Sequence, residues 1–414
     1  MPSSCSKPHS TLPLSSLISL CNKKNIYKQI HMGDKEKIML KFCCLLWVLV
    51  IGMLWNVTAE DYNEDDGGMV DAFAPDAVGG GMVPAIFIFG DSLIDNGNNN
   101  DLTSFAKANY YPYGIDFNGG PTGRFSNGYT MVDEIAELLG LPLIPSYSQA
   151  SSSGDQMVNG VNFASAAAGI LDITGRNFVD RLPFNQQIKN FEDALDQIAE
   201  HLGAVDVSQV LSQSLFFVGM GSNDYLNNYL MPNYPTRNQY DGQQFADLLS
   251  KEYTSQLTKL YNLGARKFVL AGIGLMGCIP SIIAQGTTGK CSEDVNQLVL
   301  PFNANMRTMI NNLSTNLPGS KFVFVDVHNM FQDILSNAKF YGLRVVNRGC
   351  CGIGRNRGQI TCLPFQTPCP NRSEYVFWDA FHPTEAVNVL MGQKAFNGPP
   401  DFVYPMNIQQ LANI

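Results

Sequence analysis

The chain has 414 residues, of which 45% are hydrophobic and 15% charged, and its formal net charge is −9. This length can form one large α/β domain or two ordinary ones, and the composition argues against wholesale disorder. A net negative protein repels phosphate backbones, so nucleic acid is not an expected partner.

Residues 1–59 are predicted to be a leader. An uninterrupted apolar run at 42–55 follows three lysines and precedes the small residues of Val57-Thr58-Ala59. This pattern is typical of a secretory signal peptide, with a signal anchor as the alternative, and the run is too short for a stable membrane span. The stretch before the run is unusually long, which suggests that residues 1–31 come from an upstream start codon. Residues 60–83 are acidic and glycine-rich, and we expect a disordered lead-in.

The remaining chain, 84–414, has alternating strand and helix patterns. Apolar runs predict strands at 85–89, 160–163, 214–218, 267–271 and 321–327, of which 160–163 has the weakest pattern. Apolar residues spaced by three and four predict helices at 131–139, 245–261 and 295–317. A helix that leads into a strand after a short loop is typical of a parallel sheet covered on both faces. No linker or repeat interrupts this stretch, so we expect a single α/β domain.

A serine follows the first predicted strand, in the sequence Phe89-Gly90-Asp91-Ser92-Leu93. Ligands gather at the carboxyl ends of strands in open parallel sheets, so Ser92 lies where chemistry is expected. A serine hydroxyl is a poor nucleophile until a base takes its proton. The chain beyond the leader has three histidines. His201 lies in a polar stretch and is expected to be exposed, and His328, after the last predicted strand, is the second choice behind His382.

His382 is favoured as the base because Asp379 lies three residues before it and Pro383 follows. This spacing lets the carboxylate bond one imidazole nitrogen while the other faces Ser92. In isolation, Ser92 would be interpreted as a helix cap and Asp379 as a turn acceptor.

Acyl transfer also needs donors to the developing oxyanion. Asn223 follows the predicted strand at 214–218, and its side-chain amide is a candidate donor, although it could instead brace its own turn. The small residues of 162–169 suit a loop that brings a backbone N–H close to a substrate.

Four segments in this order, at 89–93, 162–169, 216–224 and 379–383, resemble the sequence blocks of the GDSL esterases/lipases of the SGNH-hydrolase superfamily. The segments 123–128 and 349–352 resemble the plant secreted branch of that family. The resemblance runs from about residue 85 to 396. It implies a three-layer α/β/α sandwich around a mainly parallel, flavodoxin-like sheet.

The resemblance also implies roles for single residues. Ser92 matches the nucleophile and a backbone oxyanion donor, Gly169 the glycine donor of the second block, and Asn223 the third donor. Asp379 and His382 match the acid and the base. In the second block, Ala167 or Ala168 is an alternative donor because three alanines precede the glycine.

The function that follows is a secreted serine esterase or lipase that forms an acyl-enzyme and needs no cofactor. One alternative is an acyltransferase that uses a hydroxyl acceptor. The other is a non-catalytic secreted glycoprotein that binds lipid or carbohydrate. The sequence leaves the ester substrate and the oligomeric state open.

Beyond the leader there are six cysteines, an even number that indicates disulfides in a secreted chain. Cys278 and Cys291 are expected to close a local loop, and the other four are expected to pair among themselves: Cys350, Cys351, Cys362 and Cys369. A zinc site is the competing interpretation. Asn312 and Asn371 begin glycosylation sequons.

Three further patterns lie near the predicted site. Asn98-Asn99-Asn100 is expected to be a solvated turn, and Asp91 and Asp95 are expected to be solvated loop residues or local caps rather than metal ligands. Five tyrosines are candidates for an acyl groove or for packing: Tyr110, Tyr111, Tyr113, Tyr225 and Tyr229.

Overall fold

The computed structural model describes residues 81–151, 154–202 and 206–414, so the predicted leader and most of the predicted lead-in lie outside the described residues. A five-stranded sheet has the order β1-β2-β3-β4-β7. Its strands are β1 Ile86–Gly90, β2 Leu215–Gly219, β3 Lys267–Ala271, β4 Lys321–Val325 and β7 Val403–Tyr404. The first four run parallel, and β7 pairs antiparallel with β4.

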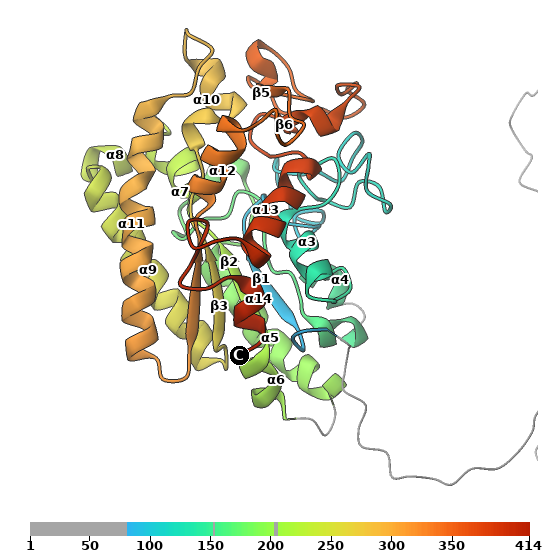
Figure 1. Cartoon of the computed structure of the whole chain (residues 1–414), viewed down its shortest axis with the longest axis vertical. Helices are drawn as coiled ribbons and strands as arrows, with labels where there is room; N and C mark the ends of the chain where they lie inside the picture. The colour runs from blue at the N-terminus through green and yellow to red at the C-terminus, as the bar shows by residue number, and fades with distance from the viewer. Residues whose placement is uncertain (1–80, 152–153, 203–205) are drawn as a thin grey trace, which may run out of the picture. The chain divides into compact units, whose positions relative to one another are not determined.

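Helices lie on both sides of this sheet (Figure 1). In chain order they are α3 Met131–Leu138, α4 Tyr147–Ala150, α5 Phe184–Leu202, α6 Val207–Gln213, α7 Ser222–Asp224, α8 Thr236–Gln239, α9 Gly242–Asn262, α10 Pro280–Gln285, α11 Glu293–Asn316, α12 Val327–Ser336, α13 Glu385–Asn397 and α14 Ile408–Ala412. A two-stranded sheet joins β5 Val345–Gly349 to β6 Tyr375–Phe377. Within the described part of the chain, no helix has the length and apolar character needed to cross a membrane.

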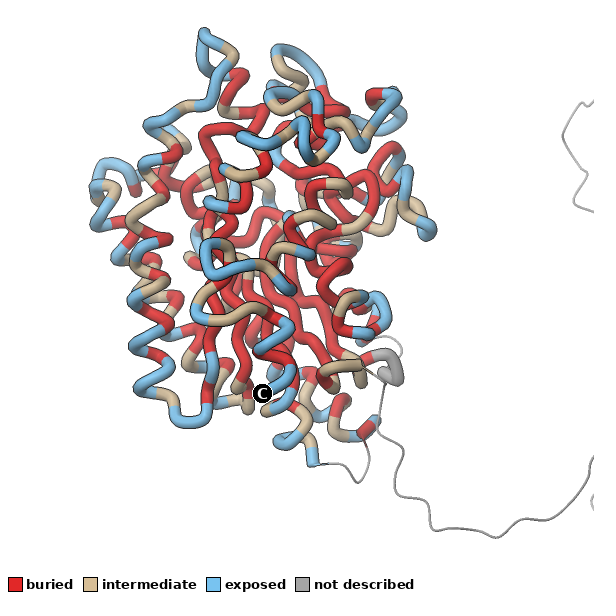
Figure 2. Tube along the Cα trace, in the orientation of Figure 1, coloured by how far each residue is buried: buried red, intermediate tan, exposed pale blue. Residues whose placement is uncertain are grey.

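Alternation along the strands divides the core into two layers. Phe87 and Phe89 of β1 belong to the hydrophobic cluster that includes residues of α5, α9 and α11, whereas Ile86 and Ile88 belong to the cluster that includes residues of α3, α12, α13 and α14. Because both faces are covered, the strands are apolar throughout, as in parallel sheets generally. In Figure 2 the strands are almost entirely buried and the exposed residues lie on the outer helices and loops. The predicted α/β architecture with a mainly parallel central sheet is confirmed.

Four strand predictions are confirmed within one or two residues at each end, but the segment 160–163 is not a regular strand. It runs beside the free side of β1, where Ile88 N–H donates to Val161 O at 3.0 Å and Phe163 N–H donates to Ile88 O at 2.7 Å. Gly160 has φ +116°, and a Cβ there would lie 1.9 Å from Ile86 O. The close approach of two backbones therefore needs this glycine.

The last predicted strand, 321–327, extends too far. β4 ends at Val325, and the Asp326 side chain accepts a hydrogen bond from Asn329 N–H, so Asp326 caps α12 and Val327 is its first residue. A buried apolar run does not distinguish a strand from the helix that follows it. Asp326 is the residue that marks the change, because aspartate is a favoured N-cap.

Candidate active site

Ser92 lies in a tight turn at the carboxyl end of β1. Asp95 N–H donates to Asp91 O at 2.9 Å, and Leu93 N–H donates to the Asp91 side chain at 3.0 Å. Gly90 ends the strand, and a Cβ there would lie 2.3 Å from Ile94 Cδ1. The chain can therefore turn back on itself directly after the strand and present Ser92 at the edge of the sheet.

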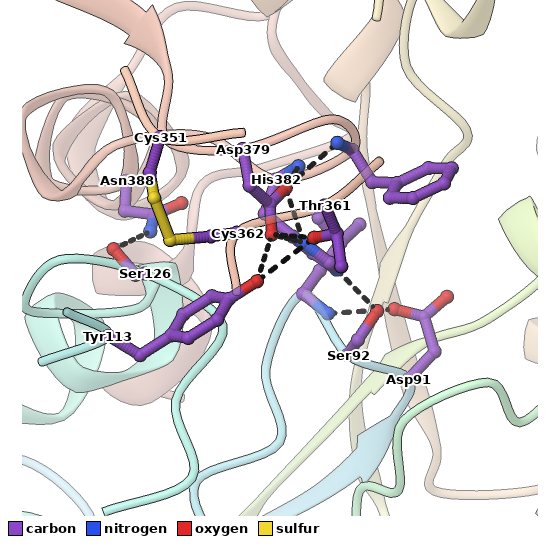
Figure 3. Close-up of polar contacts among 12 residues, drawn as sticks. Asp91, Ser92, Tyr113, Ser126, Cys351, Thr361, Cys362, Asp379, His382 and Asn388 are labelled. Carbon is purple, nitrogen blue, oxygen red and sulfur yellow. Dashed lines mark hydrogen bonds and ion pairs between the residues drawn. A yellow bond between two sulfur atoms is a disulfide. The ribbon is translucent and has the colours of Figure 1, made fainter. Parts of the chain in front are cut away.

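A continuous chain of hydrogen bonds joins Ser92, His382 and Asp379 (Figure 3). Ser92 Oγ lies 2.8 Å from His382 Nε2, and His382 Nδ1 lies 2.8 Å and 2.9 Å from the two carboxylate oxygens of Asp379. The serine and the histidine are 290 positions apart in the sequence. The loop that follows β6 brings Asp379 and His382 to the serine turn.

Asp379 is fully buried and accepts hydrogen bonds at both oxygens. Oδ1 accepts from the N–H groups of Phe381 and His382, each at 2.8 Å, and Oδ2 accepts from the hydroxyls of Tyr113 at 2.6 Å and Thr361 at 3.1 Å. Burial alone would raise the pKa of Asp379, but the neighbouring His382 and these donors outweigh it and hold the pKa below its ordinary value. The ionised carboxylate then accepts the Nδ1 proton, which leaves Nε2 free to accept from Ser92.

Tyr113 and Thr361 are partners of the carboxylate that no sequence motif identified. Tyr113 is buried, and of the five tyrosines considered above it is the one that lines the cavity at Ser92. Thr361 precedes Cys362, whose disulfide to Cys351 attaches it to the segment beside Asp379. The ring of Phe125 lies 5.0 Å from that of His382. These residues come from loops, so neither period nor spacing could reveal them.

The cysteine predictions are confirmed. Cys278 pairs with Cys291, and the four C-terminal cysteines pair as Cys350–Cys369 and Cys351–Cys362. All six sulfurs are thus in disulfides and offer no thiolate to zinc. In the described ranges, no three His, Cys, Asp or Glu side chains are grouped so that they could hold a metal ion.

Asn223 lies in α7 and lines the cavity. Its Nδ2 donates to Ala168 O at 2.9 Å, and its Oδ1 accepts from Asn227 Nδ2 at 2.6 Å. The contact with Asn227 orients the amide so that the nitrogen faces the loop at 162–169. The side-chain amide nitrogen carries two hydrogens, so a second hydrogen remains available after the first has been donated to Ala168 O.

In the loop at 162–169, Ala167 lines the cavity and Gly169 does not. A Cβ on Gly169 would lie 2.7 Å from the Asp224 carboxylate, so Gly169 packs against Asp224. Ala168 N–H donates to Ser165 O, whereas among the described residues the N–H groups of Ser92 and Ala167 have no hydrogen-bond partner. Ala167 has φ +65°, a conformation that alanine seldom adopts.

The segment Asn98-Asn99-Asn100, expected to be a solvated turn, instead holds neighbouring loops in place: the side-chain amides of Asn98 and Asn99 hold the loop at 162–169, and that of Asn100 donates to Thr122 O. Asn98 Nδ2 donates to the carbonyls of Asn162 and Ala164, and Asn99 Nδ2 donates to those of Ala106 and Ala166. Asn98 and Asn99 are almost fully buried. The prediction was wrong because a run of asparagines indicates polar side chains but does not reveal which backbone carbonyls will surround them in the fold.

Two buried carboxylates support the same loops. Asp95 accepts from the N–H groups of Gly97, Asn98 and Ala166, as expected for a local cap, and thereby ties the serine turn to the loop at 162–169. Asp224 accepts from the N–H groups of Ile170 and Leu171 and from the Thr174 hydroxyl. Burial raises the pKa of both carboxyls to about 6.

The other predicted site residues lie elsewhere. His201 is exposed on α5, and its Nδ1 lies 2.7 Å from Gln197 O. His328 is the second residue of α12 and does not line the cavity. Asn312, on α11, and Asn371 are both exposed.

The sequence has extensive similarity to known proteins. Residues 86–395 match the family model described as GDSL-like Lipase/Acylhydrolase. The chain is 69% identical over 337 residues to GDSL esterase/lipase At1g71691 of Arabidopsis thaliana, which covers 81% of this chain and 87% of the relative. It is 50% identical over 338 residues to GDSL esterase/lipase At1g29670 of the same plant, with coverage of 80% and 92%. The chain therefore belongs to the GDSL lipase/acylhydrolase family.

Proposed function

We propose that this protein is a secreted hydrolase of carboxylic esters that works through an acyl-enzyme on Ser92. The observation that carries the proposal is the hydrogen-bonded chain from Ser92 through His382 to the buried Asp379, at the wall of a largely apolar cavity. Membership of the GDSL family, whose relatives are named esterases/lipases, supports the ester as the bond attacked.

In the first step, Ser92 Oγ attacks the ester carbonyl while His382 Nε2 takes its proton. The ionised Asp379 stabilises the imidazolium that forms, and the imidazolium then gives the proton to the departing alcohol. In the second step water attacks the acyl-enzyme while His382 Nε2 takes its proton; the bond between the acyl carbon and Ser92 Oγ then breaks, His382 returns the proton to Oγ, and the acid is released.

The developing oxyanion would be held by three donors: the N–H groups of Ser92 and Ala167 and the second amide hydrogen of Asn223. Ala167 replaces our expectation of Gly169, because it faces the cavity with a free N–H whereas Gly169 faces Asp224. A backbone donor does not depend on the side chain, so alanine can serve where the family resemblance implies glycine.

Secretion is supported by the apolar run at 42–55 and by the three disulfides, which persist in oxidising compartments. Asn312 and Asn371 are exposed, so both sequons are accessible to glycosylation.

The test is hydrolysis of p-nitrophenyl butanoate by the purified protein beside Ser92→Ala, combined with labelling by an organophosphonate. Turnover should be abolished in Ser92→Ala, and mass spectrometry should locate the label on Ser92. A wild-type protein that is neither labelled nor active would support the binding glycoprotein instead. Product analysis with excess alcohol separates hydrolysis from acyl transfer, because a new ester would appear only if transfer occurs.

A further inference from the structure

The segment 334–373 has a charge unlike that of the chain as a whole. The chain has a formal net charge of −9, yet this segment contains no aspartate or glutamate. It includes β5 and the turn Arg355–Arg357, and β5 and β6 lie at the top of the molecule in Figure 1. The basic residues of the segment are Lys339, Arg344, Arg348, Arg355, Arg357 and Arg372.

Two of these arginines are used inside the fold. Arg372 forms an ion pair with Asp116, and the guanidinium of Arg357 donates to Cys350 O. Neither side chain is therefore free to bind a partner through its charge.

Three other arginines present their charge to solvent. The Arg344 side chain is 75% exposed, and its ion pair with Glu374 is 3.4 Å long, so it contributes little in water. Arg348 and Arg355 are also exposed, and among the described residues no carboxylate forms an ion pair with either of them. This part of the surface is therefore positive although the protein as a whole is negative.

The fold gathers the three exposed arginines around β5 and β6. The guanidinium of Arg348 lies 5.8 Å from the centre of the Tyr375 ring on β6, and Arg344 pairs with the residue just before that tyrosine. Asn356 belongs to the turn that carries the third arginine, and its Nδ2 donates to Asn347 O at 2.8 Å. This bond holds the turn against β5, next to Arg348.

Exposed apolar side chains accompany this charge. Ile353 and Ile360 lie on either side of the turn, pair with each other through backbone hydrogen bonds of 3.0 and 3.3 Å, and are 40% and 49% exposed. Single exposed apolar side chains are common on protein surfaces, but these two adjoin arginines that lack a counter-charge. We call Arg344, Arg348, Ile353, Arg355 and Ile360 the basic patch.

We propose that the basic patch binds the surface of an anionic phospholipid bilayer. Guanidinium groups match the oxygens of phosphate, and the two isoleucines supply apolar area that the region beneath the headgroups can accept. An acidic polysaccharide would satisfy the arginines but not the isoleucines. Charges are screened beyond about 8 Å at physiological ionic strength, so the negative charge elsewhere on the protein does not prevent local attraction.

This inference goes beyond the proposed function and does not depend on it. Thr361 follows Ile360 directly and lines the cavity at Ser92, so a bilayer bound at the patch would lie near the catalytic residues. Binding itself needs no catalysis, and Ser92→Ala should bind vesicles as tightly as the wild type.

The experiment measures co-sedimentation of the purified protein with vesicles of phosphatidylcholine alone or of phosphatidylcholine and phosphatidylglycerol in equal amounts. The wild type should bind only the mixed vesicles, and high salt should release it. Replacing Arg344, Arg348 and Arg355 together by glutamine should raise Kd about 100-fold, since each basic side chain near an anionic surface contributes about fivefold. Ile353→Ser combined with Ile360→Ser should raise Kd about tenfold.

The matched control replaces Arg237, Lys251 and Lys321 together by glutamine. These side chains are exposed on α8, α9 and β4, and the change in net charge is the same. The control should keep the wild-type Kd. The arginine variant should keep the wild-type unfolding midpoint in urea and the same hydrolysis of p-nitrophenyl butanoate, which excludes unfolding as the cause of lost binding.

The proposal is overturned if the wild type does not bind the mixed vesicles, or if the control loses as much affinity as the arginine variant. Binding to immobilised polygalacturonate without binding to vesicles would also overturn it and would identify an acidic polysaccharide as the partner. A protein that binds the mixed vesicles as described but cleaves no ester would leave this inference standing and refute the proposed function.

Discussion

Tyr113 provides the sharpest test of how the carboxylate is held. Tyr113→Phe removes the 2.6 Å hydrogen bond to Asp379 Oδ2 and leaves the ring in place. A hydrogen bond to a charged group contributes about 1.5–3 kcal/mol. Because Thr361 still donates to the same oxygen, we expect the lower end, about 1.5 kcal/mol, in both the free energy of unfolding and the activation barrier. This corresponds to about a tenfold loss of kcat/KM.

The effect of Tyr113→Phe on stability should depend on pH in a defined direction. The pKa of Asp379 lies below its ordinary value, so its contribution to stability is present at neutral pH and is lost as the pH falls through the native pKa. Removing the Tyr113 donor raises that pKa. The stability difference between wild type and Tyr113→Phe should therefore be full at pH 7 and shrink below about pH 4.

Tyr110→Phe is the control, since Tyr110 lies three residues away and its ring centroid is 5.4 Å from that of Tyr113. Its hydroxyl donates to Cys362 O at 2.9 Å and not to Asp379. Urea denaturation and steady-state hydrolysis of a p-nitrophenyl ester measure both effects. The reasoning is refuted if Tyr113→Phe keeps kcat/KM within twofold of wild type, or if Tyr110→Phe loses as much activity.

Three further predictions concern the scaffold, each measured by urea denaturation. Asn99→Ala removes a buried amide that donates to two carbonyls and should lower the free energy of unfolding by about 2–3 kcal/mol. Replacing Cys351 and Cys362 by alanine opens a loop of sequence separation 11 and should cost about 3 kcal/mol. Burial raises the pKa of Asp95 and Asp224 to about 6, so the native state holds protons that the unfolded state releases above about pH 4. Stability should therefore fall as the pH rises from about 4 to 6.

Each of these has an outcome that would contradict it. Asn100→Ala removes one partly buried hydrogen bond, from the side-chain amide to Thr122 O, and should lower the free energy of unfolding less than Asn99→Ala does. An equal or larger decrease would argue against the role of Asn99 in holding the loop at 162–169. An unchanged unfolding midpoint without the Cys351–Cys362 bond would show that this disulfide does not stabilise the native state. A free energy of unfolding that increases between pH 4 and 6 would mean that the buried carboxyls are not protonated as argued.

Local patterns were sufficient for much of the architecture. The strands β1 to β4 were predicted within one or two residues at each end, because a strand buried on both faces is apolar throughout. Asp379 and His382 could be paired from the sequence since both lie in one loop, three residues apart. The segment at 160–163 was predicted as a strand but forms only an isolated bridge to β1, because its approach to β1 depends on the close contact of Gly160 rather than on a period.

What the sequence determined by itself was the four parallel strands β1 to β4, the helices α3, α9 and α11, and the choice of Ser92, Asp379 and His382 as candidates, since each follows from residues near one another in the chain. Only the tertiary structure decided the partners of those residues. It places Tyr113 and Thr361 against the carboxylate of Asp379. It also places Ala167 rather than Gly169 at the cavity, and it buries Asn98 and Asn99, whose side chains hold the loop at 162–169. These outcomes depend on contacts between segments that are distant in the sequence. Burial decides whether a polar group is solvated by water or hydrogen-bonded within the protein, and a short stretch of sequence does not reveal burial.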